Sequence, residues 1–229
     1  MVDSYNPQYT LYGTSPLVFN LKEAYDETMQ GMHKLPDWIL QLPGMSGVTY
    51  RKMANNLVNK IADARYLEVG CWQGSTACAA VYGNNVKAYC IDNWSQFNDD
   101  GSISTKFAEH VAKLESDQLT FVDQDYTVTD FSNIGKYNVY LFDGPHEEYD
   151  QYMGVLTAQS ALEDEYILIV DDWNWPFVRK GTYDALNELK SKVLFSVEIR
   201  TSIDDTHPLD SRGTNTYWHN GVIFAVIKK

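Results

Sequence analysis

The sequence predicts an α/β fold, a three-layer αβα sandwich around a mostly parallel sheet of seven strands that ends in an antiparallel C-terminal hairpin. From residue 66 onward, short apolar runs alternate with amphipathic segments, the pattern of right-handed βαβ crossovers and a parallel sheet. The last two apolar runs are joined only by the polar stretch 201–219, so they are expected to pair antiparallel.

The first 60 residues are expected to form a helical cap or lid within the same domain. Residues 1–20 mix polar and aromatic side chains without a period, which predicts an irregular arm. Leu21–Met32 carries its acids early and precedes a lysine, which favours a short helix, and Asp37–Gln41 is a short helix or a turn. Tyr50–Ile61 places apolar residues at helical spacing, so this helix is expected to face the sheet.

Residues 61–229 are expected to form the main α/β unit. The predicted strands are Tyr66–Val69, Ala88–Ile91, Leu119–Val122, Val139–Phe142, Tyr166–Val170, Val193–Ile199 and Gly221–Ile227. The predicted helices are Ser75–Tyr82, Thr105–Leu114, Glu148–Ala161 and Arg179–Ser191. Since parallel strands end at one edge of a sheet, polar residues that follow different strands are expected to meet there.

Composition restricts the partners and the compartment. The formal net charge of -13 disfavours nucleic acid and anionic membranes as partners. No apolar run is long enough for a transmembrane helix, and the N-terminus does not resemble a signal peptide. Three cysteines in apolar surroundings indicate free thiols, which favours a cytoplasmic location.

A glycine turn follows the first predicted strand. The segment 66–75 carries an acid, Glu68, then Gly70 and Gly74, and small residues continue into the next helix. A turn of this kind lets the backbone approach a ligand closely. The dinucleotide fingerprint requires a glycine at the position of Trp72, so the motif differs from it. By itself the motif is equally compatible with a structural turn. The candidate cofactor-binding residues of this segment are Glu68, Gly70, Cys71, Trp72, Gly74 and Ser75.

Further polar residues follow the second and third predicted strands. Asp92 ends the second strand, where an acid can accept hydrogen bonds from the ribose of NAD or of S-adenosylmethionine, or simply cap a loop. Asn93 follows it, and Trp94 can stack on an adenine or pack in the core. Asp125, after the third strand, is a candidate partner for an adenine amino group or an exposed turn residue.

Three acids follow the fourth and fifth predicted strands. Asp143 ends one strand, and Asp171 and Asp172 end the next, so the three carboxylates are expected to converge. Carboxylates at such a short distance from one another repel unless a cation or a proton neutralises them, and Mg²⁺ prefers such oxygen ligands. The alternative is that Asp171 caps the next helix while Asp172 is solvated.

In order and spacing, these motifs resemble the class I S-adenosylmethionine-dependent methyltransferases, and in particular the branch of the macrocin and novobiocin O-methyltransferases. The similarity covers roughly residues 45–180. It implies a Rossmann-like methyltransferase sheet, a catalytic domain at 61–229, and a sugar hydroxyl as the common methyl acceptor. It also implies that Asp143, Asp171 and Asp172 hold Mg²⁺.

One position departs from that branch. Its sugar-modifying members often carry an acid, a proposed general base, two residues after the first metal-binding Asp, where this chain has Pro145. His146 is the nearest group able to accept a proton, and it is a candidate catalytic residue together with Asp143. Asp143 is also, like Asn93, a candidate cofactor-binding residue. A structural role for His146 is equally compatible with the sequence.

The sequence therefore favours a metal-assisted O-methyltransferase acting on a small molecule or a sugar hydroxyl, with S-adenosylmethionine and Mg²⁺ as cofactors. Glu68 would reach the cofactor's ammonium group or order the loop through backbone amides, and the Gly44–Gly47 loop would act as a lid. The alternatives are an NAD-dependent oxidoreductase of Rossmann type and a non-catalytic cofactor-binding module. A homo-oligomer is possible, and the sequence does not identify the acceptor.

Overall fold

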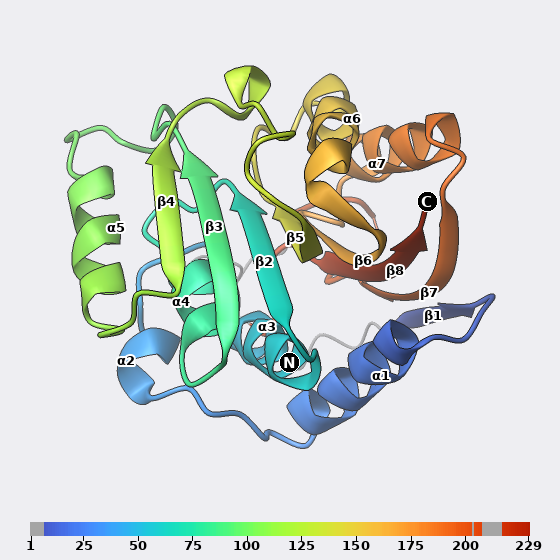
Figure 1. Cartoon of the computed structure of the whole chain (residues 1–229), viewed down its shortest axis with the longest axis horizontal. Helices are drawn as coiled ribbons and strands as arrows, with labels where there is room; N and C mark the ends of the chain where they lie inside the picture. The colour runs from blue at the N-terminus through green and yellow to red at the C-terminus, as the bar shows by residue number, and fades with distance from the viewer. Residues whose placement is uncertain (1–6, 203, 208–216) are drawn as a thin grey trace.

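The computed structural model describes residues 7–202, 204–207 and 217–229, so the predictions for the first residues of the arm and for much of the 201–219 connection lie outside the described residues. The described chain forms an eight-stranded sheet with the strand order β1-β7-β8-β6-β5-β2-β3-β4, shown in Figure 1. The pairs formed among β2 to β6 are parallel, and those that include β1, β7 or β8 are antiparallel.

The parallel half confirms the predicted strands, with ends that differ by a few residues. Its members are β2 (Ala64–Val69), β3 (Val86–Asp92), β4 (Leu119–Asp123), β5 (Tyr137–Phe142) and β6 (Leu162–Asp171). In register, Val69 lies beside Ile91 on one side and Phe142 on the other, so these strands end level with one another. This common edge is where the polar residues after each strand gather.

The antiparallel C-terminal hairpin is also confirmed. Strand β7 (Lys192–Ile199) pairs with β8 (Val222–Lys228), which inserts between β7 and β6. The prediction of seven strands was wrong, because β1 (Gln8–Leu11) pairs antiparallel with β7 and adds an eighth. This four-residue strand lies at the edge of the sheet and exposes Tyr9 and Leu11, so its own sequence carries little of the pattern of a buried strand.

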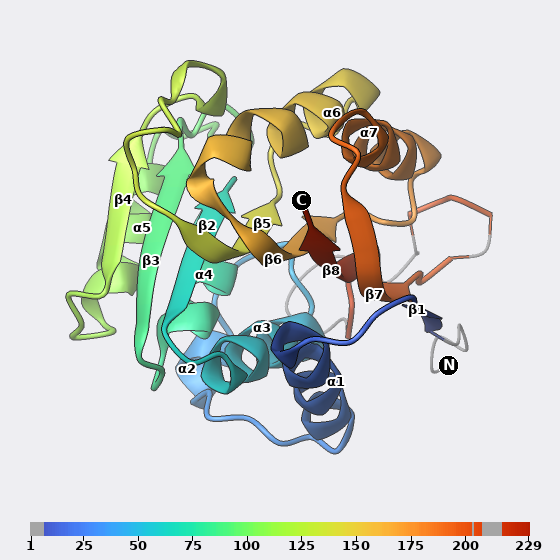
Figure 2. The same ribbon diagram turned by 45° about the vertical axis from the view of Figure 1, so that its right-hand side comes forward.

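The helices pack on both faces of the sheet, as Figure 2 shows, with α6 and α7 above it and α1, α2 and α3 below it. Their bounds are α1 Pro16–Met29, α2 Asp37–Leu40, α3 Val48–Lys60, α4 Ser75–Val81, α5 Ile103–Ala112, α6 Glu148–Thr157 and α7 Pro176–Glu188. Helix α1 begins before the predicted residue 21, because Ser15 caps it and Pro16 starts it. The predicted helix 148–161 ends as a 3₁₀ turn, Ala158–Ala161.

Alternate residues of the central strands feed two separate cores. Val139 and Leu141 of β5 join residues of α1 and α3, whereas Tyr140 and Phe142 join residues of α6 and α7. A strand segment covered on both faces is apolar at successive positions, which explains the continuous apolar runs Val139–Phe142 of β5 and Tyr166–Val170 of β6. Helices α1 and α3 therefore share a core with the sheet.

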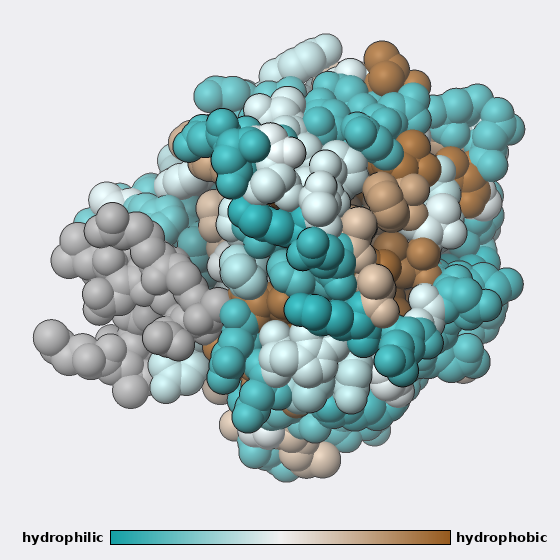
Figure 3. Space-filling view, turned by 90° about the vertical axis from the view of Figure 1, so that its left-hand side faces the viewer, coloured by the Kyte–Doolittle hydropathy of each residue, from teal (hydrophilic) through white to brown (hydrophobic). Residues whose placement is uncertain are grey.

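The β4 edge of the molecule is shown in Figure 3, where hydrophilic residues cover most of the surface and apolar residues gather toward one side. The connection from β4 to β5 contains only a short 3₁₀ turn, Tyr126–Val128, within the described residues. In the part of the chain that the structure describes, no helix is both long enough and apolar enough to cross a membrane.

Candidate functional site

A cleft opens where β2, β3, β4 and β5 end. It encloses about 710 Å³, counting the open solvent at its mouth. Its lining combines Val69, Gly70, Trp72, Ile91, Asp92, Asn93, Gln124, Asp125, Tyr126, Asp143, Gly144, Pro145 and His146 with Met45 and with Ser95, Gln96 and Phe97. Of the predicted strand-end acids, Asp92, Asp125 and Asp143 thus line one cavity, whereas Asp171 and Asp172 do not.

The glycine turn after β2 is held in place by Asp92. The backbone N–H groups of Cys71 and Trp72 donate to Asp92 Oδ2 at 2.7 and 2.8 Å, and that of Trp94 donates to Oδ1 at 2.7 Å. Gly70 and Trp72 both have positive φ, of 87° and 44°. Trp72 therefore adopts a conformation that favours glycine, and its side chain lines the cleft.

Replacing Asp92 with alanine is expected to lower the free energy of unfolding by about 3 kcal/mol, because three backbone donors lose a charged acceptor. Denaturant titration measures this loss. Amide hydrogen exchange at Cys71 and Trp72 is expected to accelerate more than exchange in β5. Unchanged exchange at both amides would show that Asp92 does not hold the turn.

Glu68 occupies a different place from the one predicted. Its carboxylate accepts from the Tyr66 hydroxyl at 2.6 Å and the Thr76 hydroxyl at 2.5 Å, and its side chain does not line the cleft. The expected contact with loop amides was therefore wrong, since Asp92 accepts those bonds. The reason is strand alternation, which points Tyr66 and Glu68 to the same face, under helix α4. Burial raises the pKa of Glu68 to about 8.

Four other candidates pack behind the cleft instead of lining it. Cys71 is buried, Gly74 begins α4 and packs on Phe107, and Ser75 Oγ lies 2.9 Å from Ser46 Oγ. Trp94 packs edge-on or tilted against Phe107 and Phe121 and donates its indole N–H to the Trp72 carbonyl at 3.0 Å. Of its two interpretations, core packing is the one that the structure shows, and Trp94 does not line the cleft.

Asn93 and Asp125 form a hydrogen-bonded pair at the cleft wall, with 2.9 Å between Asn93 Nδ2 and Asp125 Oδ2. Hydrogen bonds from the hydroxyl and the backbone N–H of Thr127 lower the pKa of Asp125. The charge at this wall is therefore stable near neutral pH, which suits an amino or hydroxyl donor on a ligand.

Met45 and residues 95–97 also line the cleft, although none of them was among the individual candidate residues. Met45 lies in the predicted Gly44–Gly47 lid, which is anchored by the buried Arg51. Its guanidinium donates to the carbonyls of residues 39, 40 and 42 and to Ser46 Oγ. An arginine in an amphipathic helix gives no local signal of this role, since its acceptors are backbone atoms of another segment.

A carboxylate–imidazole cluster of Asp143, His146 and Asp172 lies at one end of the cleft, which Asp143 and His146 line. His146 Nε2 lies 2.6 Å from Asp172 Oδ2 and 3.5 Å from Asp143 Oδ1. One ligand atom from each of the three residues lies within 4.8 Å of the others. Burial opposes a charged imidazole, but the two carboxylates outweigh it and raise the pKa of His146. For Asp143, burial is the main effect and raises the pKa.

The expected three-Asp group is only partly assembled. Asp143 and Asp172 come together, but Asp171 lies outside the cluster, and His146 takes the third place. Asp171 is the last residue of β6, and consecutive residues at a strand end diverge. Its side chain is buried, and its Oδ1 has no hydrogen-bond partner among the described residues, nor has the buried hydroxyl of Tyr50. Burial and the charges of Asp143 and Asp172 raise the pKa of Asp171.

Comparison with solved structures relates this arrangement to a known fold. An O-methyltransferase from Bacillus cereus in complex with SAH matches with a TM-score of 0.56 and 11% identity, over 92% of this chain and 91% of that chain. TomG from Streptomyces achromogenes, an O-methyltransferase involved in tomaymycin synthesis, was solved with SAM. It matches with a TM-score of 0.55 and 14% identity, over 96% of this chain and 92% of that chain. The fold is that of the class I methyltransferases.

The methyltransferase fold also matches TrmN from Thermus thermophilus, with a TM-score of 0.54 and 12% identity over 79% of this chain. The chain spans about half of TrmN, 48% of its length. The sequence matches no family model, and no curated protein matches it at a significant level. At these identities the likeness concerns the fold, and function must be argued from the cleft itself.

Proposed function

We propose that the protein is an S-adenosylmethionine-dependent O-methyltransferase in which a divalent cation assists the reaction. The observation that carries the proposal is that Asp143 and His146 belong both to the cleft lining and to the carboxylate–imidazole cluster. A cofactor in the cleft would therefore lie next to groups able to bind a cation and accept a proton. The O-methyltransferase neighbours support this choice of reaction.

The cleft residues fit the cofactor by their chemistry. Gly70 contributes its backbone to the cleft wall, and Asp92 and Asp125 offer carboxylates for hydroxyl and amino donors. The apolar walls from Val69, Ile91 and the nearby Phe97 suit an adenine or a thioether chain. These residues would hold the cofactor at the carboxyl edge of the sheet.

The cluster fits a divalent cation. Two carboxylate oxygens and an imidazole nitrogen lie within 4.8 Å of one another, and Asp171 beside them has a buried oxygen without a partner among the described residues. Carboxylate oxygens suit Mn²⁺ as well as Mg²⁺, so the expected choice extends to both ions. Asp143 and Asp172 would hold the cation.

The position of each residue would determine its role in the reaction. When bound, the cofactor supplies an electrophilic methyl group, and the cation lowers the pKa of an acceptor hydroxyl. Asp143 and Asp172 would hold the cation against that hydroxyl. His146 would accept the proton at Nε2, because a bound cation would neutralise the two carboxylates that raise the pKa of the imidazole in its absence. Met45 and the anchored loop around it would limit the entry of water. Most of the rate enhancement would come from positioning.

The NAD-dependent alternative has weaker support. The middle glycine of the dinucleotide fingerprint is replaced by Trp72, whose side chain lines the cleft where a pyrophosphate would approach the backbone.

Calorimetry with S-adenosylhomocysteine, NAD, Mg²⁺ and Mn²⁺ tests the proposal. We expect S-adenosylhomocysteine to bind and NAD not to bind. Asp172→Asn is expected to weaken Mn²⁺ binding by roughly tenfold or more, with unchanged S-adenosylhomocysteine affinity because Asp172 does not line the cleft. Asp130→Asn, which removes an exposed charge, is the control. Absence of S-adenosylhomocysteine binding at millimolar concentration would overturn the proposal. An unchanged Mn²⁺ response in Asp172→Asn would remove its metal component.

A further inference from the structure

Asp172 lies in a turn whose backbone is hydrogen-bonded by a distant segment of the sequence. It follows β6 with φ 54°, a conformation that non-glycine residues rarely adopt. The backbone N–H groups of Trp173 and Asn174 donate to the carbonyls of Gly221 and Asn220, at 3.2 and 3.0 Å. The segment that precedes β8 therefore fixes the backbone of this turn.

The same segment also binds the side chain of Asp172. Asn220 is fully buried, and its Nδ2 donates to Asp172 Oδ1 at 2.7 Å. Because Oδ1 is occupied, the other oxygen, Oδ2, is the one that faces His146 Nε2 at 2.6 Å. The bond to Asn220 thus selects which oxygen of Asp172 enters the cluster.

A chain of hydrogen bonds fixes the orientation of the Asn220 amide. The backbone N–H of Thr201 can only donate, and it lies 2.8 Å from Asn174 Oδ1, which identifies that atom as the acceptor. Asn174 Nδ2 is then a donor, and it lies 3.0 Å from Asn220 Oδ1. Asn220 must therefore present its own Nδ2 to Asp172, the arrangement in which every member has its partner.

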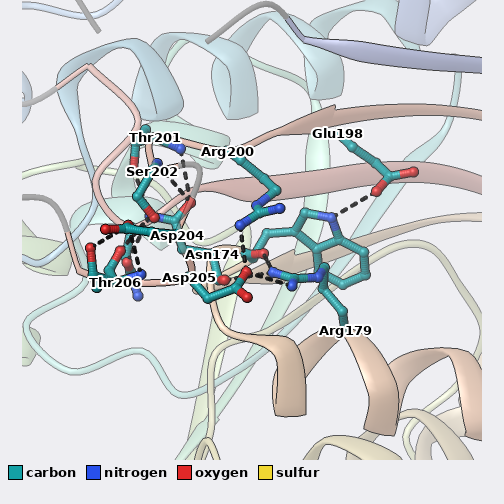
Figure 4. Close-up of polar contacts among 11 residues, drawn as sticks. Asn174, Arg179, Glu198, Arg200, Thr201, Ser202, Asp204, Asp205 and Thr206 are labelled. Atoms are coloured by element: carbon teal, nitrogen blue, oxygen red, sulfur yellow. Dashed lines mark hydrogen bonds and ion pairs between the residues drawn. The ribbon is translucent and has the colours of Figure 1, made fainter.

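The loop after β7 anchors the start of this series of hydrogen bonds. Figure 4 shows Asn174 bound to Thr201, with Arg179 and Arg200 both directed at Asp205. Arg179 also donates to the carbonyl of Asn174 and to that of the preceding residue. The turn that carries Asp172 is thus tied to this loop by side-chain and backbone bonds together.

We propose that Asn220, oriented by Asn174, is a positioning residue that holds Asp172 with a single oxygen directed at the cation site. The inference rests on the metal component of the proposed function. Outer residues that orient metal ligands commonly affect affinity by roughly 10- to 100-fold, so Asn220→Ala is expected to weaken Mn²⁺ binding within that range.

The test compares Mn²⁺ affinity, S-adenosylhomocysteine affinity and thermal unfolding in the full chain. Asn220→Ala removes the donor to Asp172, and Asn220→Ser retains a hydroxyl donor and is expected to recover part of the Mn²⁺ affinity. Asn138→Ala is the matched control. Asn138 is also a buried asparagine, bonded to the backbone of residues 63 and 65, and it lies at the opposite ends of the strands.

The outcomes are distinguishable. Weaker Mn²⁺ binding in Asn220→Ala with unchanged S-adenosylhomocysteine affinity, and unchanged Mn²⁺ binding in Asn138→Ala, would support the proposal. Equal Mn²⁺ affinity in the wild type and both Asn220 variants would overturn it and leave the proposed function intact. An equal loss in Asn138→Ala would assign the effect to general destabilisation and overturn it as well. Wild-type protein that binds no Mn²⁺ would overturn both the metal component and this inference.

Discussion

Replacing Gly70 with alanine is expected to lower the free energy of unfolding by about 3 kcal/mol or more and to prevent ligand binding in the cleft. Gly70 has φ 87°, and a Cβ at this position would lie 1.9 Å from the carbonyl oxygen of Asp143. The two strand ends cannot separate to make room, because the backbone N–H of Asp143 donates to the Val69 carbonyl at 2.9 Å. Denaturant titration and calorimetry with S-adenosylhomocysteine measure the two effects.

Gly101→Ala provides the matched control for this variant. Gly101 has φ 69°, and a Cβ there would meet nothing within 4 Å. It therefore carries the conformational penalty alone, about 1 kcal/mol. If Gly70→Ala destabilises the protein no more than Gly101→Ala does, the close contact between the ends of β2 and β5 is not what requires glycine.

Glu68 is expected to make the protein less stable as the pH rises from about 4.5 to about 8. Burial raises its pKa from 4.5 to about 8 in the folded protein, so in this interval the folded state binds a proton that the unfolded state has lost. The stability that Glu68 contributes by binding this proton is therefore fully present below its pKa in the unfolded protein. It is lost as the pH rises through its pKa in the folded protein. The loss amounts to about 1.4 kcal/mol per pH unit, or about 5 kcal/mol over the interval.

Glu68→Gln removes this titration and keeps the shape of the side chain. Its two hydroxyl partners, Tyr66 and Thr76, can each donate or accept, so both hydrogen bonds can persist. We expect the variant to match the wild type near pH 4.5 and to be several kcal/mol more stable at pH 8. Urea unfolding across this range is the measurement, and Glu109→Gln, at an exposed position, is the control. Parallel stability curves for the wild type and Glu68→Gln would contradict the prediction.

Much of the fold follows from patterns that are local in the sequence. The apolar runs of β5 and β6 are continuous because both faces of these strands are covered, and the same runs end in the acids that reach the cleft. Strand β1 could not be predicted in the same way. Its four residues become a strand because β7 offers an unpaired edge, and that edge exists only after the sheet has formed.

The candidate site, like the fold, could be predicted from the sequence only in part. The positions of Gly70, Asp92 and Asp143 at the ends of strands were sufficient to predict that they share a cleft. Glu68 and Trp94 were assigned to the cofactor by their nearness in sequence to these residues. Strand alternation points Glu68 under helix α4, and Trp94 packs with Phe107 from the following helix, so nearness in sequence was misleading.

The sequence by itself determined the order of strands and helices in the parallel half, the edge of the sheet at which the cleft opens, and the acids available there. Those features depend on side-chain periodicity and on residues that follow one another along the chain. The tertiary structure alone decided that Asp172 joins Asp143 and His146 while Asp171 does not, and that Asn220 directs the Asp172 carboxylate. These contacts join residues from separate elements, and a hydrogen bond between distant segments requires a direction and a distance that only packing supplies.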